Sequence, residues 1–273
     1  MPSAHRPAHR PPACALLAAA VLACLVLAGC GGGASGAGNR AAASGSAAGS
    51  DAGGRVTVLA AASLTEAFGA IARQVERDHP GTDVEVSFAA SSTIVQQVNQ
   101  GAPADVIALA GQQAMAPLDR SLLVPHSVRV FARNSLEIAT PASNAAHVSG
   151  LTDLADPATK VVLCAEEVPC GAAARTTLAK AGVDAHVVSY ERDVKAALAK
   201  VQLGEADAAI VYHSDVATAG ENVRGVPIPP DVNEVLRYPI ARLDDAPAAH
   251  AFVRAVLSPE GQQRLRADGF ETR

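Results

Sequence analysis

From residue 55 onward, short apolar runs rich in β-branched residues alternate with longer runs in which apolar residues recur every three or four positions. The first pattern is typical of buried strands, and the second of amphipathic helices. Strands are expected at 56–59, 84–88, 105–110, 136–139, 160–163, 187–190, 208–212, 223–228 and 235–241. Helices are expected at 66–78, 94–100, 171–180, 194–203 and within 246–268. This alternation predicts the α/β class, with parallel sheets covered by helices.

Two of the predicted strand-to-helix turns carry hydroxyl side chains and no Lys or Arg. They are Ala-Ala-Ser-Leu-Thr at 61–65 and Ala-Ala-Ser-Ser-Thr at 89–93. In such a turn the first N–H groups of the helix lack partners within the helix and carry the positive end of its dipole. Both turns lie at the carboxyl ends of strands, where ligands of parallel sheets bind. They therefore indicate a site for an anion held by neutral donors.

The residues alone leave the roles of these hydroxyls open. Glu66 follows Ser63 at the spacing of a capping box, so Ser63 is as well suited to cap its helix as to contact a ligand. In the second turn, one of Ser91, Ser92 and Thr93 is suited to be the cap while another faces a ligand. Asp105 is expected to fix the loop that enters its strand rather than to act on a substrate.

The N-terminal 54 residues are interpreted as a targeting segment and a tether. Residues 1–29 have a basic start and a short apolar run that ends in Leu-Ala-Gly-Cys, the pattern of a lipoprotein signal peptide with Cys30 as the lipidation site. The alternative is a membrane-spanning anchor, for which the run is short. Residues 30–54 continue as a Gly/Ala/Ser-rich flexible tether. The remaining 219 residues, 55–273, suit one large domain or two lobes.

Charge and aromatic content exclude several classes of partner. Loss of residues 1–29 removes two arginines and no acid, so the formal net charge goes from −5 to −7. This charge argues against nucleic acid as a partner and gives no long-range attraction to an anion. The absence of Trp and an aromatic content of 3% argue against stacking platforms for sugars or nucleobases. An anion site in this chain must therefore be a local arrangement of dipoles.

Two of the five cysteines remain after processing and lipidation, Cys164 and Cys170. A pair this close outside the cytoplasm predicts a disulfide, and the alternative is two small buried thiols. The spacing is unusual for zinc and no His lies nearby, which argues against a metal site.

An enzyme using Ser63 or Ser91 as nucleophile was the alternative from another class. Neither serine lies in Gly-x-Ser-x-Gly, and the chain has no HExxH, phosphate-loop or dinucleotide-binding motif. His213 is the one histidine at a predicted strand end, and it is expected at the surface.

Five segments in register resemble the molybdate-binding proteins of ABC importers. They are VTVLAAASLTEAF, SFAASSTIVQQVNQGAPADV, EEVPCG, RDVKAAL and AAIVYHSDV. The resemblance implies a two-lobed type II periplasmic-binding fold, in which each lobe is a mainly parallel sheet flanked by helices. Lobe one would comprise 55–134 and 238–273 and lobe two 135–237, with two hinge crossings between them.

The resemblance also implies a set of ligand contacts. Ser63, Ser91 and Tyr212 would donate from their hydroxyls, and Cys170 and Val194 from their backbone N–H groups. The family usually has alanine in place of Cys170, but a backbone contact tolerates that change, and a disulfide would stiffen the loop that presents it. Asp193 neighbours Val194, but the resemblance does not place it on the ligand.

The implied function is capture of molybdate, and of tungstate, for an ABC permease, without covalent chemistry. The implied protein is an extracytoplasmic monomer held at the membrane by lipid (palmitate) on Cys30, with no cofactor and no direct metal ligand. Both oxyanions are fully deprotonated near pH 7, so a site made only of donors suits them. A binder of sulfate or another tetrahedral oxyanion is the alternative within the same fold, and an extracytoplasmic serine hydrolase is the alternative outside it.

Overall fold

The computed structural model describes residues 53–272. The predicted signal peptide, the lipidation site Cys30 and the tether up to residue 52 lie outside the described residues. Within the described range, no helix is long and apolar enough to cross a membrane.

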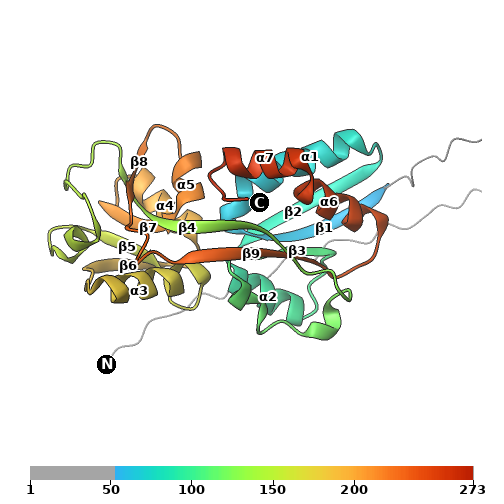
Figure 1. Ribbon diagram of the computed structural model, residues 1–273, viewed down its shortest axis with the longest axis horizontal. Helices are drawn as coiled ribbons and strands as arrows, with labels where there is room; N and C mark the ends of the chain where they lie inside the picture. The colour runs from blue at the N-terminus through green and yellow to red at the C-terminus, as the bar shows by residue number, and fades with distance from the viewer. Residues whose placement is uncertain (1–52, 273) are drawn as a thin grey trace, which may run out of the picture. The chain divides into compact units, whose positions relative to one another are not determined.

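Strands and helices alternate along the described chain (Figure 1). The strands are β1 (Gly54–Ala61), β2 (Thr82–Ala89), β3 (Val106–Ala108), β4 (Arg129–Pro141), β5 (Val161–Cys164), β6 (Val187–Glu191), β7 (Ala208–Tyr212), β8 (Val223–Pro227) and β9 (Val235–Arg242). The α-helices are α1 (Thr65–Asp78), α2 (Ser91–Asn99), α3 (Pro169–Ala181), α4 (Val194–Gln202), α5 (His213–Thr218), α6 (Pro247–Leu257) and α7 (Pro259–Ala267). Short 3-10 helices are η1 (Ala62–Leu64), η2 (Gln112–Met115), η3 (Arg120–Leu122) and η4 (Leu151–Ala155).

The strands form one sheet in the order β2-β1-β3-β9-β4-β7-β5-β6, with β8 paired to β4. β1, β2 and β3 are mutually parallel at one end, and β5, β6 and β7 are parallel at the other. β4 and β9 pair antiparallel with their neighbours in the middle. The predicted α/β class is confirmed, and the sheet of the described chain is mixed: four of its strand pairs are parallel and four are antiparallel.

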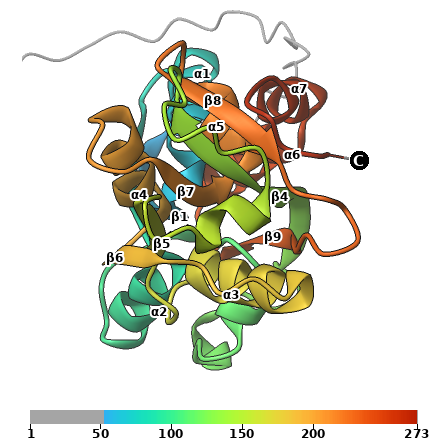
Figure 2. The same ribbon diagram turned by 90° about the vertical axis from the view of Figure 1, so that its left-hand side faces the viewer.

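The sheet divides into two halves along β4. Residues 129–135 of β4 pair with β9, and residues 136–141 pair with β7 and β8. We call the strands β1, β2, β3 and β9, with α1, α2, α6 and α7, the first half, and β5 to β8, with α3 to α5, the second half (Figures 1 and 2). β4 thus carries the chain from one half to the other, and the return crossing leads into β9.

The helix α5 was not predicted from the sequence, and two further elements differ from the expectation in their extent. β4 is longer than the predicted strand at 136–139, because its first part carries Arg129, Arg133 and Asn134 among apolar residues, which hides the strand pattern. The predicted helical region at 246–268 is two helices. Ser258 ends α6 and caps α7 by accepting a hydrogen bond from the Gly261 N–H, and Pro259 begins the new helix.

An aromatic cluster connects the core of the first half to the carboxyl ends of the strands. Phe68 of α1 packs on Phe131 and Phe252 with ring centroids 5.6 and 5.4 Å apart. Tyr238 of β9 packs edge-on against Phe131, and its ring lies 6.1 Å from that of Tyr212 at the end of β7. Tyr238 is completely buried, so its ring belongs to the core while its hydroxyl approaches the strand ends described next.

Candidate functional site

Six strand ends meet around one small cavity of about 20 Å³. β1, β2 and β3 of the first half and β5, β6 and β7 of the second half all end near it, as expected for the carboxyl edge of parallel strands. All five residues predicted as contacts line it, and each is at least 96% buried: Ser63, Ser91, Cys170, Val194 and Tyr212. The sheet topology therefore brings together residues separated by up to 149 positions. We call this space the small cavity.

Ser63 lies in η1, directly after β1, and does not cap α1. The residue that precedes α1 is Leu64, and it makes no side-chain cap hydrogen bond. The Ser63 hydroxyl instead lies 3.0 Å from the Tyr238 hydroxyl. The capping alternative for Ser63 is therefore wrong, and its hydroxyl belongs to a buried polar contact at the wall of the small cavity.

Ser91 is the hydroxyl of the second turn that reaches the small cavity. It is the first residue of α2, and its oxygen accepts a hydrogen bond of 2.8 Å from the Ala110 N–H. Ser92 lines a different, larger space, and Thr93 is exposed. The Ala110 contact occupies a lone pair of Ser91, which leaves its proton to be donated elsewhere.

Cys170 and Val194 present backbone N–H groups at the starts of α3 and α4. Cys170 is the second residue of α3 and Val194 the first of α4, so neither N–H has an acceptor within its helix. The predicted disulfide is present and ties Cys164, at the end of β5, to Cys170. Gly171 lets the start of α3 lie close to the backbone of Ala165, because a Cβ at this position would lie 2.0 Å from the Ala165 carbonyl oxygen.

Tyr212 ends β7, and its hydroxyl is buried without a hydrogen-bond partner in the described part of the chain. The Tyr238 hydroxyl is a neighbour, but the two form no hydrogen bond of normal geometry. Burial, and then the proximity of Tyr238 and Asp215, raise the pKa of Tyr212 well above its ordinary value. Tyr212 therefore stays protonated near neutral pH, and its unpaired hydroxyl is a donor that lacks an acceptor.

A charged cluster beside the small cavity was missed by the sequence reasoning. Lys195, next to Val194, lies 2.9 Å from Glu66 of α1 and 3.1 Å from Asp215 of α5. Burial raises the pKa of Asp215 to about 6, opposed by Lys195. Burial works against the charge of Lys195, but Asp215 and Glu66 raise its pKa above the ordinary value. Glu66 and Lys195 are 129 residues apart, and no local pattern could have paired them.

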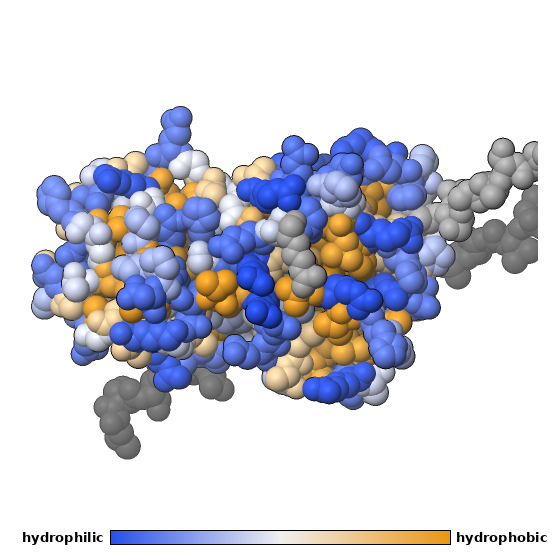
Figure 3. All heavy atoms as spheres, in the orientation of Figure 1, coloured by the Kyte–Doolittle hydropathy of each residue, from blue (hydrophilic) through white to orange (hydrophobic). Residues whose placement is uncertain are grey.

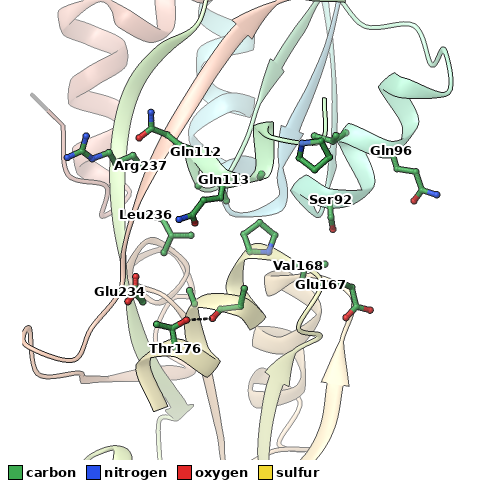
Figure 4. A pocket seen from close by; sticks show the side chains of 18 of the residues that line it. Ser92, Gln96, Gln112, Gln113, Glu167, Val168, Thr176, Glu234, Leu236 and Arg237 are labelled. Atoms are coloured by element: carbon green, nitrogen blue, oxygen red, sulfur yellow. Dashed lines mark hydrogen bonds between the residues drawn. The ribbon is translucent and has the colours of Figure 1, made fainter. Parts of the chain in front are cut away.

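A large cleft of about 920 Å³ adjoins the small cavity and shares Ala110, Val168 and Pro169 with it. Figure 4 shows Ser92 and Gln113 of the first half facing the segment around Val168 of the second half across this cleft. On the face drawn in Figure 3, hydrophilic and hydrophobic residues lie side by side where the two halves meet. The lining of the cleft is likewise mixed, with polar side chains such as Gln112 and Thr176 beside apolar ones such as Val95 and Leu236.

The family model described as bacterial extracellular solute-binding protein matches residues 56–271. The chain belongs to this family. A relative of this solute-binding protein, the molybdate-binding protein ModA of Mycobacterium tuberculosis (strain ATCC 25618 / H37Rv), is 36% identical over 218 residues, which cover 79% of this chain and 84% of the relative.

Solved structures share the fold. The substrate binding domain of a putative molybdenum ABC transporter from Clostridium difficile is 30% identical to this solute-binding protein with a TM-score of 0.62, and the match covers 80% of this chain and 99% of that one. The sulfate-binding protein SubI from Mycobacterium tuberculosis H37Rv is 19% identical with a TM-score of 0.71, and the match covers 80% and 86% of the two chains. The second likeness concerns the fold alone.

In this solute-binding protein the small cavity offers hydrogen-bond donors, and within residues 53–272 no Lys, Arg or His lines it. Asp193 is the one carboxylate of its lining, and it caps α4 by accepting from the Ala196 N–H at 2.9 Å. His213 is half exposed and bonded to Glu137, which confirms its expected surface position. Asp105 fixes its loop as predicted, by accepting from the Thr57 N–H.

Proposed function

We propose that this protein captures molybdate, and tungstate, outside the cytoplasm and delivers it to an ABC permease. The observation that carries the proposal is the small cavity: it is lined by hydroxyl and N–H donors, one of which, on Tyr212, is buried without an acceptor. The molybdate-binding relatives support the choice of ligand. Ser63, Ser91 and Tyr212 would donate from side chains, and Cys170 and Val194 from the backbone.

The chemistry of the donors favours a fully deprotonated dianion. Each of the four oxygens of molybdate or tungstate can accept more than one hydrogen bond near pH 7, so the five donors meet only acceptors. Hydrogen phosphate carries a proton that needs an acceptor, and Asp193, the only carboxylate that lines the small cavity among residues 53–272, already caps α4. Direct metal ligands and catalysis have no part in this scheme. Discrimination against sulfate would rest on cavity size.

Entry of the ion requires the two halves to move apart. A space of about 20 Å³ holds little more than one water molecule. We place the hinge at the two crossings, so that lobe one comprises 55–134 and 238–273 and lobe two 135–237. Ser63 and Ser91 then close on Cys170, Val194 and Tyr212 from opposite sides. Contacts from both lobes give the ion a higher affinity for the closed state.

The N-terminal segment determines the localisation of the protein in this proposal. Lipidation of Cys30 would hold a monomer at the membrane surface, and the tether of residues 30–54 would give it reach to the permease.

A thermal-shift panel with molybdate, tungstate, sulfate and phosphate at equal concentration tests the function. A ligand present at about 1,000 times its dissociation constant stabilises the folded state by about 4 kcal/mol. For a domain of roughly 220 residues this raises the melting temperature by about 8–16 °C. We expect this shift with molybdate and tungstate. A shift with sulfate alone would favour the sulfate-binding alternative, and no shift with any of them would refute the proposal.

The hydrolase alternative is tested separately. Turnover of ester substrates that is lost in Ser63→Ala or Ser91→Ala would establish it and contradict a purely binding role.

A further inference from the structure

The buried side chain of Asn134 has a fixed orientation. Its Oδ1 accepts from the N–H groups of Ser135 at 3.1 Å and Ser214 at 3.4 Å. The opposite amide orientation would turn two donors against two N–H groups, so the network settles which atom is nitrogen. The Nδ2 group therefore points the other way, and donates to the Ser214 hydroxyl at 2.7 Å and to the Tyr238 hydroxyl at 3.4 Å.

This orientation favours one direction for the next hydrogen bond. Ser63 Oγ and the Tyr238 hydroxyl lie 3.0 Å apart, and either of them can donate. Because Asn134 already donates to the Tyr238 oxygen, we assign Tyr238 as the donor to Ser63. Burial raises the pKa of Tyr238 well above its ordinary value, so the proton is present at neutral pH. A Ser63 oxygen that accepts from Tyr238 keeps its own proton for another acceptor, and such chains strengthen each member.

Ser91 is oriented in a matching way by the backbone. The Ser91 oxygen accepts a hydrogen bond from the Ala110 N–H, and its hydroxyl proton likewise remains available to a further acceptor. Both serines of the small cavity thus have one lone pair occupied from behind by a buried donor. The difference is that the partner of Ser63 is a side chain, which substitution can change without altering the backbone.

We propose that Asn134 and Tyr238 are positioning residues that orient the Ser63 hydroxyl to donate into the small cavity, and so restrict the site to oxyanions without a proton. The proposal rests on the proposed function, because it assigns a direction to one of the contacts of that site. Neither residue lines the small cavity, and both act through Ser63.

A double-mutant cycle tests this role. Molybdate affinity is measured by calorimetry for the wild type, Tyr238→Phe, Ser63→Ala and the double variant, with each fold checked by its melting curve. Tyr238→Phe keeps the ring in its aromatic cluster and removes only the hydroxyl. We expect Tyr238→Phe to weaken binding about twofold to tenfold, because a hydrogen bond between two neutral groups, here Tyr238 and Ser63, contributes about 0.5–1.5 kcal/mol. In the Ser63→Ala background the same change should have no effect on affinity, because the hydroxyl that Tyr238 orients is then absent.

Two further variants sharpen the result. Tyr190→Phe removes the hydroxyl of an exposed tyrosine and is the matched control, with unchanged affinity expected. Asn134→Asp keeps the shape but replaces the amide donor with an acceptor, so that Tyr238 donates backward to the new carboxylate and a lone pair of Ser63 faces the cavity. We expect a larger loss of molybdate affinity than in Tyr238→Phe, together with easier displacement of molybdate by phosphate.

The outcomes separate the two proposals. Equal losses from Tyr238→Phe in both backgrounds would overturn the positioning role while leaving molybdate capture intact. A wild-type protein that binds no molybdate in the same titration would overturn the proposed function itself.

Discussion

Lys195 on α4 binds both carboxylate oxygens of Glu66 on α1, at 3.0 and 2.9 Å, and so links the two halves of the sheet. Glu66 lies three residues after Ser63, and Lys195 is the neighbour of Val194. The ion pair therefore lies directly beside the small cavity and forms when its two walls are close. It stabilises the arrangement in which the donors of both halves converge.

Glu66→Gln is expected to weaken molybdate binding by about twofold to fivefold, since partly exposed ion pairs contribute about 0.2–1 kcal/mol. Lys195 keeps Asp215 as a partner, so the variant leaves no isolated buried charge. Calorimetric titration measures the change. Glu205→Gln, which breaks an exposed pair with Lys200 inside the second half, is the control and should bind like the wild type. Equal affinities in all three proteins would contradict a role for the pair in closure.

Asp215 gives the stability a defined dependence on pH. Its pKa is about 6 in the folded protein against 3.8 for the ordinary side chain, because it is fully buried. Folding therefore takes up a proton at pH values between these two pKa values. The contribution of Asp215 to the free energy of unfolding falls as the pH rises from about 4 to 6, and it stays constant at higher pH. The fall is about 3 kcal/mol at most.

Asp215→Asn should remove this contribution. We expect the wild type to lose stability relative to the variant between pH 4 and pH 7, measured as the difference in their unfolding free energies in urea at each pH. Other titrating groups are shared and cancel in the difference. A difference that does not change with pH would show that Asp215 titrates normally.

Tyr212→Phe separates binding from folding. The hydroxyl has no hydrogen-bond partner among residues 53–272, so its removal should leave the melting temperature unchanged or raise it slightly. Molybdate affinity should fall about tenfold to a hundredfold, because a hydrogen bond to a charged ligand contributes about 1.5–3 kcal/mol. Wild-type affinity in this variant would remove Tyr212 from the site, and Tyr190→Phe again serves as the control.

The Cys164–Cys170 disulfide is expected to hold the start of α3 in its binding position. Cys164→Ala should weaken molybdate binding about twofold to fivefold, the effect of about 0.5–1 kcal/mol of added ordering cost. Mild chemical reduction of the disulfide in the wild type should lower the molybdate affinity by the same factor. The same treatment should not change the affinity of the variant. Unchanged affinity in both experiments would mean that α3 is held without the bridge.

The sequence predicted what local patterns encode. Strand-to-helix turns are read from neighbouring residues, and the turns of Ser63 and Ser91 were placed in this way. The choice between a capping and a ligand-facing Ser63 needed Tyr238, which is 175 residues away. The same holds for Glu66 with Lys195 and for Asn134 with Tyr238, because sheet topology brings these residues together and a single sequence carries no signal for it. The contacts of Cys170 and Val194 were predicted only through the family resemblance, because any residue type except proline can offer a backbone N–H.

Crystals grown with molybdate, with diffraction recorded on both sides of the molybdenum absorption edge, locate the ion itself. We expect one dominant anomalous peak inside the small cavity, within hydrogen-bond distance of the Ser63, Ser91 and Tyr212 hydroxyls and the Cys170 and Val194 nitrogens. A peak that lies elsewhere, or a small cavity left without one at saturating molybdate, would contradict the proposed site and function.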